Sequence, residues 1–510
     1  MSEAERDRDA WWETRGYAVA LVIASVTPLL LPAIPPLVDV PGHIGRLHLM
    51  LGGSPFLDRF YSPGSWPIGN LGVDMFVLAL GPAIGAEMAT RIIVTLIPPL
   101  TVVAMLWVAR EAHGRLPPTA AFAVPLAYSH PFLFGFVNYS IGVAFALLTF
   151  AVWLRLGNAG RLRARALIMA PLALITFVAH VSAWGLLGLM AFGAEVARRR
   201  DGEESWPRAI VRSVVQCLPL ALPLILLLLW RSGAGGETSG WFNFILKANR
   251  ISTIFRDRWM AVDLASLFVV LAMLLYARDR RDLRWSRPLT GAALLVLLAF
   301  LIIPGWLFGS AYADMRIAPV MLILIVLAVG VRPGADRRHL HWLAVAAVSF
   351  AALRLGAVSV SLHIAADEHR QLLSALDHLP PRSRLVVLVD HRGNRWPLQR
   401  NDHIGSMAIA RRDSFSNDQW ELEGGTTVLI HYPAAGEFQS ADSQMVAEGN
   451  SNVPSMDQAL AALPTDAFDA LWLVDSVARP DPKGWVRIYH APGNDLYLRG
   501  PQAGRRTTQP

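Results

Sequence analysis

Residues 17–36 read YAVALVIASVTPLLLPAIPP, a run that contains no charged side chain. An α-helix needs about 20 apolar residues to cross the hydrocarbon core of a bilayer, so this run is long enough to span one. Further blocks that meet or approach that length lie at residues 214–230, 290–308 and 341–362. The sequence therefore predicts an α-helical polytopic membrane protein.

The composition supports a membrane protein rather than a large soluble core. Of 510 residues, 54% are hydrophobic and 17% charged, and the apolar residues come in long blocks. The net charge is +7, but the arginines stand in short clusters between these blocks, which indicates topology signals and not a nucleic-acid surface. The single cysteine, Cys217, excludes a disulfide within the chain. No small-residue cleavage site follows the first block, so we expect a retained helix.

Arginine-rich connectors predict the topology. They lie at residues 155–165, 198–212, 278–287 and 332–338. Because positively charged loops stay in the cytoplasm, the N-terminus is expected there, and residues 363–510 are expected in the periplasm of a bacterial inner membrane. Residues 71–85 form a short apolar block that contains Asp74, and we expect this block to be re-entrant or only partly inserted; the alternative is a wrongly divided block near residues 119–154. The expected count is about eleven spanning helices.

Two domains are predicted. Residues 1–362 form the transmembrane domain, with a first external loop at about residues 37–70, and residues 363–510 form a small periplasmic α/β domain. The tail has short β-type runs separated by Gly, Pro and Asp, at residues 384–389, 426–431, 470–474, 485–488 and 496–498. Helical patterns lie near residues 365–378 and 403–411.

Polar residues at helix ends in a membrane are costly and usually indicate function. In this chain they gather in the expected external connectors, whereas the cytoplasmic connectors hold plain arginine anchors. The external set is Asp39, His43, Arg46, His48, His130, Asn138, His180, Arg256, Asp257, Arg258, Asp314 and Arg316. A site at the outer membrane surface is predicted.

The first external loop begins LVDVPGHIGR at residues 37–46. A helix starting near Pro41 would place His43 and Arg46 on one face, with Asp39 just before its N-terminus. Asp39 could then accept a proton from a hydroxyl nucleophile, and Arg46 could bind a phosphate. An ordinary helix cap with an interfacial arginine explains the same residues.

The chain resembles the GT-C glycosyltransferases, which are polytopic enzymes that use lipid-phosphate sugar donors. The resemblance covers the layout of the whole chain, and no single motif in it is specific. It is carried by Asp39 with His43, by HPFLFGFVNY at residues 130–139, by AHVS at residues 179–182 and by YADMR at residues 312–316.

This resemblance implies an inverting glycosyltransferase with Asp39 as general base and His43 beside it. The implied donor is a polyprenyl-phosphate sugar, and the implied acceptor is a glycan, lipid or protein outside the cytoplasm. A divalent metal, Mg or Mn, is sometimes used in the family, with Asp39 and Asp74 as possible ligands here. Asp314 and Asp257 are further candidates for a second acidic residue.

Other external residues have both a binding and a structural interpretation. His130 and Asn138 flank a glycine-containing turn that could line a lipid or sugar cavity, or they could cap backbone groups. His180 lies at the apex of a predicted helical hairpin, where it could pack or bind. In the tail, His403 lies at a predicted helix start and could reach toward the membrane site.

The external segment of residues 231–259 interleaves aromatic residues with cations, including Arg256 and Arg258. This composition suits a sugar phosphate on a lipid carrier, and equally an interfacial helix on anionic lipid. Asp314 and Arg316 open a spanning helix. Asp314 suits the helix dipole as a cap, whereas Arg316 opposes the dipole and needs a partner, either a phosphate or Asp314.

Three other functions compete with this hypothesis. A transporter or flippase of lipid-linked sugars would show paired repeats and polar groups at the bilayer midplane. A non-catalytic scaffold for envelope assembly would use the external domain for binding. An enzyme of the O-antigen ligase or polymerase type would carry its key Arg and His residues in a large loop between late helices.

Overall fold

The computed structural model describes residues 10–66, 69–229, 237–307, 309–391, 396–421, 427–449, 453–477 and 479–500. The chain forms two compact units. We call the first the membrane unit; it comprises Met1–Leu31, Ile68–Val73 and Val94–Val360. We call the second the tail unit; it comprises Pro32–Pro67, Asp74–Ile93 and Ser361–Pro510. The first external loop therefore belongs to the same unit as the C-terminal tail.

The membrane unit is built from helices and one small sheet. Its helices are α2 (Arg15–Leu30), α6 (His130–Phe134), α7 (Val137–Asn158), α8 (Leu162–Ala179), α9 (Val181–Asp201), α10 (Trp206–Cys217), α11 (Pro223–Leu229), α12 (Phe244–Ser252), α13 (Met260–Asp279), α14 (Arg287–Ile302) and α15 (Ala313–Leu327). Strands β2 (Leu283–Trp285) and β3 (Val329–Val331) pair antiparallel. Helices α4 (Gly72–Ile84), α5 (Ala86–His113) and α16 (Arg337–Leu373) contribute residues to both units.

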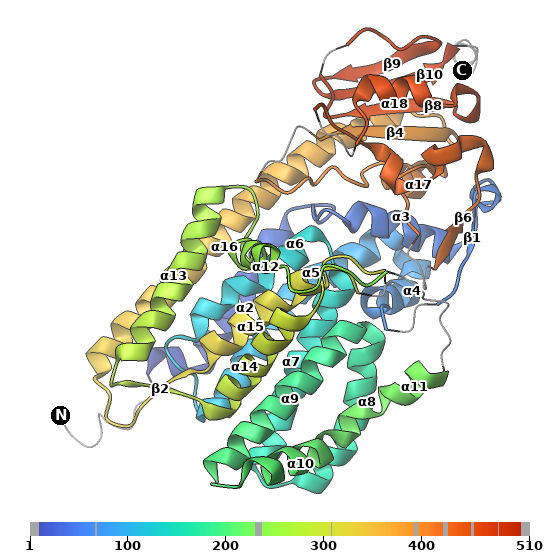
Figure 1. The fold of residues 1–510 in the computed structure, drawn as a ribbon. Coiled ribbons are helices and arrows are strands. Elements are labelled where there is room, and N and C mark those ends of the chain that lie inside the picture. Colours follow the sequence, from blue (N-terminus) through green and yellow to red (C-terminus); the bar gives the residue numbers. More distant parts are fainter. Residues whose placement is uncertain are drawn as a thin grey trace. The chain divides into compact units, whose positions relative to one another are not determined.

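Helix α9 is central to the bundle of the membrane unit. It packs against α7, α8 and α14, and α14 packs in turn against α15 (Figure 1). The contact between α9 and α14 is close because two glycines meet there: a Cβ added at Gly193 would lie 2.5 Å from the carbonyl oxygen of Gly291. Small residues allow such close helix packing within a membrane.

The helices of the described residues fit a membrane protein. Five are long and apolar enough to cross a bilayer: α5, α7, α8, α13 and the helix Arg337–His378. Shorter apolar helices lie at Arg15–Leu30, Gly72–Ile84, Ala120–Phe134 and Arg287–Ile302. The polytopic class is thus confirmed, while the count of about eleven spans and the direction of each terminus stay predictions.

Helix α4 has the length that the re-entrant prediction for residues 71–85 requires. Its 13 residues extend about 20 Å, which is too short for a hydrocarbon core of about 30 Å. Gly85, with φ of 79°, separates it from α5. The left-handed conformation at this position favours glycine and allows the chain to turn abruptly.

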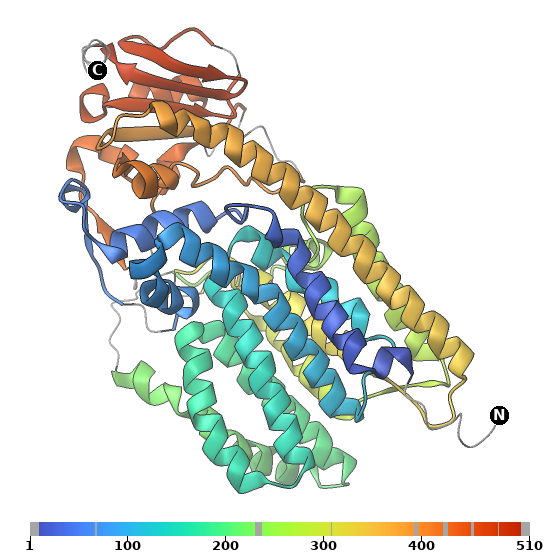
Figure 2. The same cartoon turned by 180° about the vertical axis from the view of Figure 1, so that it is seen from behind.

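The last spanning helix is longer than expected. The sequence predicted a span at residues 341–362 and a separate helix at residues 365–378, but α16 runs without a break from Arg337 to Leu373 and continues as a 3₁₀ turn, Ser374–His378 (Figure 2). Residues 357–373 contain no glycine or proline to end the helix.

The tail unit contains the predicted small sheet. Its strands are β1 (Tyr61–Pro63), β4 (Arg384–Asp390), β5 (Phe415–Ser416), β6 (Val428–Ile430), β7 (Met445–Val446), β8 (Ala470–Val474), β9 (Trp485–Ala491) and β10 (Asn494–Arg499). The main sheet has the order β5-β4-β8-β10-β9, with β5, β4 and β8 parallel and β10 antiparallel to both neighbours. All five predicted β runs are confirmed, although residue 426 of one lies outside the described residues.

The helices of the tail unit are α3 (Val40–Leu51), α17 (Ser406–Arg412) and α18 (Met456–Ala462). The predicted helix at residues 403–411 therefore begins three residues late, because His403 adopts a left-handed conformation, with φ of 59°, in the preceding turn. Left-handed backbone does not continue a right-handed helix.

Residues of the first external loop form part of the core of the tail unit. Strand β1 pairs with β6, and the ring of Phe60 lies 5.2 Å from that of Phe415. Tyr61 stacks on Phe415 and donates a hydrogen bond of 2.8 Å to the carbonyl of Ser416. These aromatic contacts fix the loop, and with it α3, to the C-terminal sheet.

Candidate functional site

Helix α3 carries the first group of predicted site residues. It begins at Val40, so Asp39 is its N-cap residue, and Pro41 stands in its first turn as expected. The carboxylate of Asp39, which is half-buried, makes no capping hydrogen bond to α3, whose first turn lies wholly within the described residues. The ordinary capping interpretation of Asp39 is therefore not what the structure shows.

Two glycines bring α3 against the C-terminal part of the tail unit. A Cβ at Gly42 would lie 2.2 Å from Cζ3 of Trp420, and one at Gly45 would lie 2.9 Å from the amide nitrogen of Gln419. Gln419 also donates from Nε2 to the carbonyl of Gly42 at 3.1 Å. A residue larger than glycine would separate these elements.

Arg46 is committed to an ion pair. Its two terminal nitrogens donate to the two carboxylate oxygens of Asp74 at 2.8 and 2.9 Å, and Nη1 also donates to Oγ1 of Thr427 at 2.9 Å. Arg46 is 8% exposed and Asp74 1%. The bidentate face of Arg46 is thus turned to Asp74, which gives Arg46 a structural partner, and the binding of a phosphate by Arg46 stays a prediction.

The same pairing bears on the expected metal. The described residues contain no group of three or more His, Cys, Asp or Glu side chains that could hold an ion. Of the two possible ligands, Asp74 faces the guanidinium of Arg46, whose positive charge opposes a cation at the same carboxylate. Asp39 and Asp74 therefore do not fit a Mg or Mn site.

Contact with Arg46 fixes the tautomer of His43. Nη2 of Arg46 lies 3.2 Å from Nδ1 of His43. A guanidinium has only N–H donors, so Nδ1 must be the acceptor, and neutral His43 carries its proton on Nε2. His43 is consequently a hydrogen-bond donor through Nε2 and not a second base through Nδ1.

His403 lies beside the same helix in the tail unit. Its Nδ1 is 2.8 Å from the carbonyl of Asp418, and its ring lies 4.5 Å from the ring of Trp420. The ring of His43 meets Trp420 from another direction, at 5.5 Å. The structure therefore groups Asp39, His43 and His403 around the N-terminal turn of α3, and it adds Trp420, which the sequence analysis did not identify.

Asp418, whose carbonyl contacts His403, also forms buried hydrogen bonds beside this group. Its carboxylate accepts hydrogen bonds from the backbone N–H and the hydroxyl of Ser406, the latter at 2.8 Å. Complete burial raises the pKa of the Asp418 carboxyl to about 6. No motif in the sequence marks this residue, since its partner Ser406 is the first residue of α17, 12 positions away.

In the membrane unit, Asn138 and His180 have structural partners. Asn138 accepts from the backbone N–H of Val73 at 2.6 Å and donates to the carbonyl of Asn70 at 2.8 Å. His180 is the N-cap of α9, and its Nδ1 accepts from the N–H of Ser182 at 3.1 Å. Both side chains form hydrogen bonds with backbone groups, and a binding role for either residue stays a prediction.

Asp314 lies among cations of α12. It is fully buried, 3.5 Å from Nζ of Lys247 and 3.2 Å from Nε of Arg250, and it accepts from the N–H of Met315 at 2.8 Å. Asp314 is therefore an ion-pair partner as well as a residue of the first turn of α15. Lys247 and Arg250, which were not among the predicted site residues, complete this group.

Arg256 and Arg258 follow α12 and are both half-buried. His130, which begins α6, is 4% exposed, and neither of its ring nitrogens has a hydrogen-bond partner among the described residues. Arg250 and Arg256 are close enough to His130 to act on it electrostatically. Residues 231–236 of the predicted segment lie outside the described residues.

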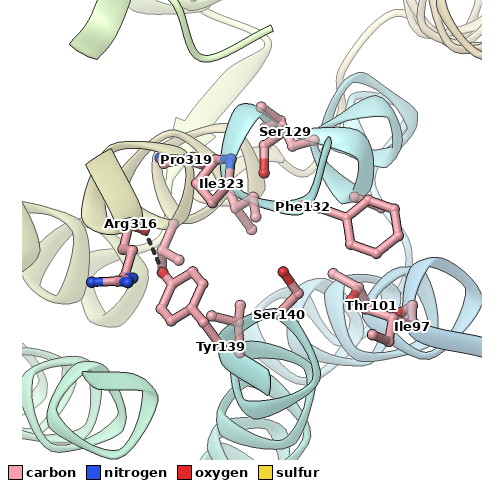
Figure 3. Close-up of a pocket in the computed structure, with 14 residues that line it drawn as sticks. Ile97, Thr101, Ser129, Phe132, Tyr139, Ser140, Arg316, Pro319 and Ile323 are labelled. Carbon is pink, nitrogen blue, oxygen red and sulfur yellow. Dashed lines mark hydrogen bonds between the residues drawn. The ribbon is translucent and has the colours of Figure 1, made fainter. Parts of the chain in front are cut away.

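Arg316 finds its partners within the membrane unit. Its guanidinium lies 4.4 Å from the ring centre of Phe136, and Nη1 donates to Ser310 and to the carbonyl of Ala311, each at 3.0 Å. Tyr139 donates to the carbonyl of Arg316 (Figure 3). The cavity beside them has a volume of about 30 Å³, which suits water rather than a sugar.

No protein-family model and no curated protein matches the chain. Among solved structures it is similar to the crystal structure of ArnT from Cupriavidus metallidurans bound to undecaprenyl phosphate. The identity is 13%, the TM-score is 0.45, and the match covers 96% of this chain and 98% of that one. A likeness this weak supports no conclusion about function, so the functional proposal is based on the side chains of this chain.

Proposed function

We propose that the chain is a membrane glycosyltransferase that moves a sugar from a polyprenyl-phosphate carrier to an acceptor outside the cytoplasm, with Asp39 as general base. The observation that supports it best is the fixed position of Asp39. Helix α3 is held by the Arg46–Asp74 pair and by close contacts at Gly42 and Gly45, so the carboxylate stands at a defined point of the tail unit.

The reaction would be a single displacement. Asp39 accepts the proton of the acceptor hydroxyl, the oxygen attacks the anomeric carbon of the donor, and the bond from that carbon to the phosphate oxygen breaks with inversion. His43 donates from Nε2 to a sugar or acceptor oxygen. His403 lies beside it and takes part in the same polar lining.

The membrane unit, taken by itself, contains a group of cations that suits the binding of a phosphate. Lys247 and Arg250 pair with Asp314, and Arg250 and Arg256 lie close to His130. A buried imidazole whose nitrogens have no partner among the described residues is a suitable donor to a phosphate oxygen. Fixed positive charge around a leaving phosphate stabilises the transition state more than it stabilises the bound donor.

The test compares wild type with Asp39→Asn in lipid nanodiscs, using a panel of radiolabelled polyprenyl-phosphate sugars. Asp58→Asn is the matched control, because Asp58 lies exposed in the same loop. We expect wild type and Asp58→Asn to transfer or hydrolyse a donor, and Asp39→Asn to lose at least about 100-fold of that rate, as is typical when a general base is removed.

Two results would count against the proposal. Equal rates in Asp39→Asn and wild type would remove Asp39 as the base. Wild type that neither binds nor turns over any donor would refute the enzyme and favour the flippase or the scaffold, which a lipid-scrambling assay on the same nanodisc preparation reconstituted into vesicles separates.

A further inference from the structure

Trp420 is a large aromatic residue that does not serve the hydrophobic core of the tail unit. That core contains Phe60, Phe415, Phe468 and Tyr497 among others, and Trp420 is not a member of it. The side chain is half-buried and lies at the first turn of α3, where its ring neighbours are His43 and His403. A tryptophan in this position contributes little to the core by burial.

The sequence nevertheless makes room for this ring at a cost. Gly42 lies inside α3, and glycine is less favourable than alanine in a helix. Even alanine at position 42 would bring a methyl group 2.2 Å from Cζ3 of Trp420. The helix is therefore built so that the indole can lie against the turn that follows Asp39.

The backbone that carries Trp420 is held rigidly. The two residues before it are buried, with Asp418 at 0% and Gln419 at 1% exposed. Asp418 accepts two hydrogen bonds from Ser406, and Gln419 donates to the carbonyl of Gly42 and to the hydroxyl of Ser406. These contacts fix the backbone from which the Trp420 side chain extends.

The neighbours of the indole are polar donors. The plane of the His43 ring makes an angle of 81° with the plane of the indole, and the plane of the His403 ring makes an angle of 59° with it. Because Nδ1 of His43 faces Arg46, neutral His43 carries its N–H at Nε2. A carbohydrate ring has apolar C–H faces and a rim of hydroxyls. An indole with two imidazole neighbours, next to the turn that follows Asp39, matches both features.

We infer that Trp420 is the stacking platform of a saccharide subsite at the Asp39 end of α3. A pyranose ring packs one C–H face on the indole, and His43 and Asp39 bind its hydroxyls. The identification of this sugar as the acceptor rests on the proposed function. The binding of a saccharide by Trp420 can be tested without turnover.

The test uses the full-length protein in nanodiscs and saturation-transfer difference NMR with a panel of methyl pyranosides of common hexoses and pentoses. Trp420→Leu keeps an apolar side chain but removes the aromatic face, and Trp420→Phe keeps a smaller ring. The matched control is Trp66→Ala, because Trp66 is a 47% exposed tryptophan of the same unit.

We expect the saccharide signal to fall about tenfold in Trp420→Leu, the loss typical of a large aromatic contact, and to be largely kept in Trp420→Phe and Trp66→Ala. A signal in Trp420→Leu equal to that of Trp66→Ala would overturn the inference, as would a wild type that binds none of the saccharides. Donor turnover by the wild type, measured beside saccharide binding, distinguishes the two proposals. If the protein binds a saccharide through Trp420 but turns over no donor, the saccharide subsite is supported and the transferase activity is refuted.

Discussion

The ion pair between Arg46 and Asp74 gives the sharpest stability prediction. Asp74→Asn keeps the shape of the side chain but removes the charge that balances a guanidinium only 8% exposed. Leaving one member of a buried pair without its partner typically costs about 3–5 kcal/mol. Thr427 and His43 remain as acceptors for Arg46, so we expect the low end, about 3 kcal/mol.

Thermal unfolding of the purified protein, followed by intrinsic fluorescence, measures this loss. For a unit of about 200 residues, 1 kcal/mol corresponds to about 2–4 °C, so the melting temperature of the tail unit should fall by about 6–12 °C. Asp58→Asn, an exposed change in the same loop, should stay within about 0.5 kcal/mol of wild type.

A double variant tests the origin of the effect. If the loss comes from an uncompensated buried charge, Arg46→Met combined with Asp74→Leu should recover most of the stability that Asp74→Asn loses. A shift in Asp74→Asn no larger than that in Asp58→Asn would refute the reasoning, because it would mean that the pair is solvated or absent in the protein.

The remaining predictions concern packing, pH and metal. Gly42→Ala should destabilise the tail unit by about 1–3 kcal/mol in the same melting assay, since the new methyl group overlaps Trp420, whereas Gly16→Ala, with nothing within 4 Å of its Cβ, should be neutral or stabilising. Because burial raises the pKa of the Asp418 carboxyl from its ordinary value of 3.8 to about 6, the folded state binds the proton more tightly than the unfolded state. Stability from this group is full below about pH 4 and is lost as the pH rises through 6, so Asp418→Asn should flatten that part of a melting-temperature profile. EDTA should leave donor turnover unchanged, because Asp74, the metal ligand proposed beside the base Asp39, is already paired with Arg46. A loss of turnover in EDTA that Mg²⁺ restores would contradict this prediction.

Local patterns were enough to predict most of the elements. Apolar blocks predicted helices such as α2 and α14, short β runs predicted β4, β8 and β10, and Pro41 marked the first turn of α3 with Asp39 before it. These features depend on neighbouring residues only. The division of α16 into two helices was wrong because the change from apolar to polar composition was taken for a break.

Pairings between distant residues were beyond the reach of the sequence. Arg46 and Thr427 are 381 positions apart, and nothing local connects them. Asp314 was expected to cap a helix, but Lys247 and Arg250 complete its surroundings from 64 and more positions away. Trp420 and Asp418 carry no motif, and only the fold shows what they touch.

The composition of the tail unit has a consequence for biogenesis. Residues of the first external loop are made early, but the strand that pairs with β1 and the residues that pack on α3 are more than 350 positions later. At about 5–20 residues per second, ribosomes need roughly 20–70 s to reach them. During that interval Asp39 has no fixed surroundings, so a chain that stops early, or whose tail stays on the wrong side of the membrane, would carry the carboxylate without the arrangement proposed to use it.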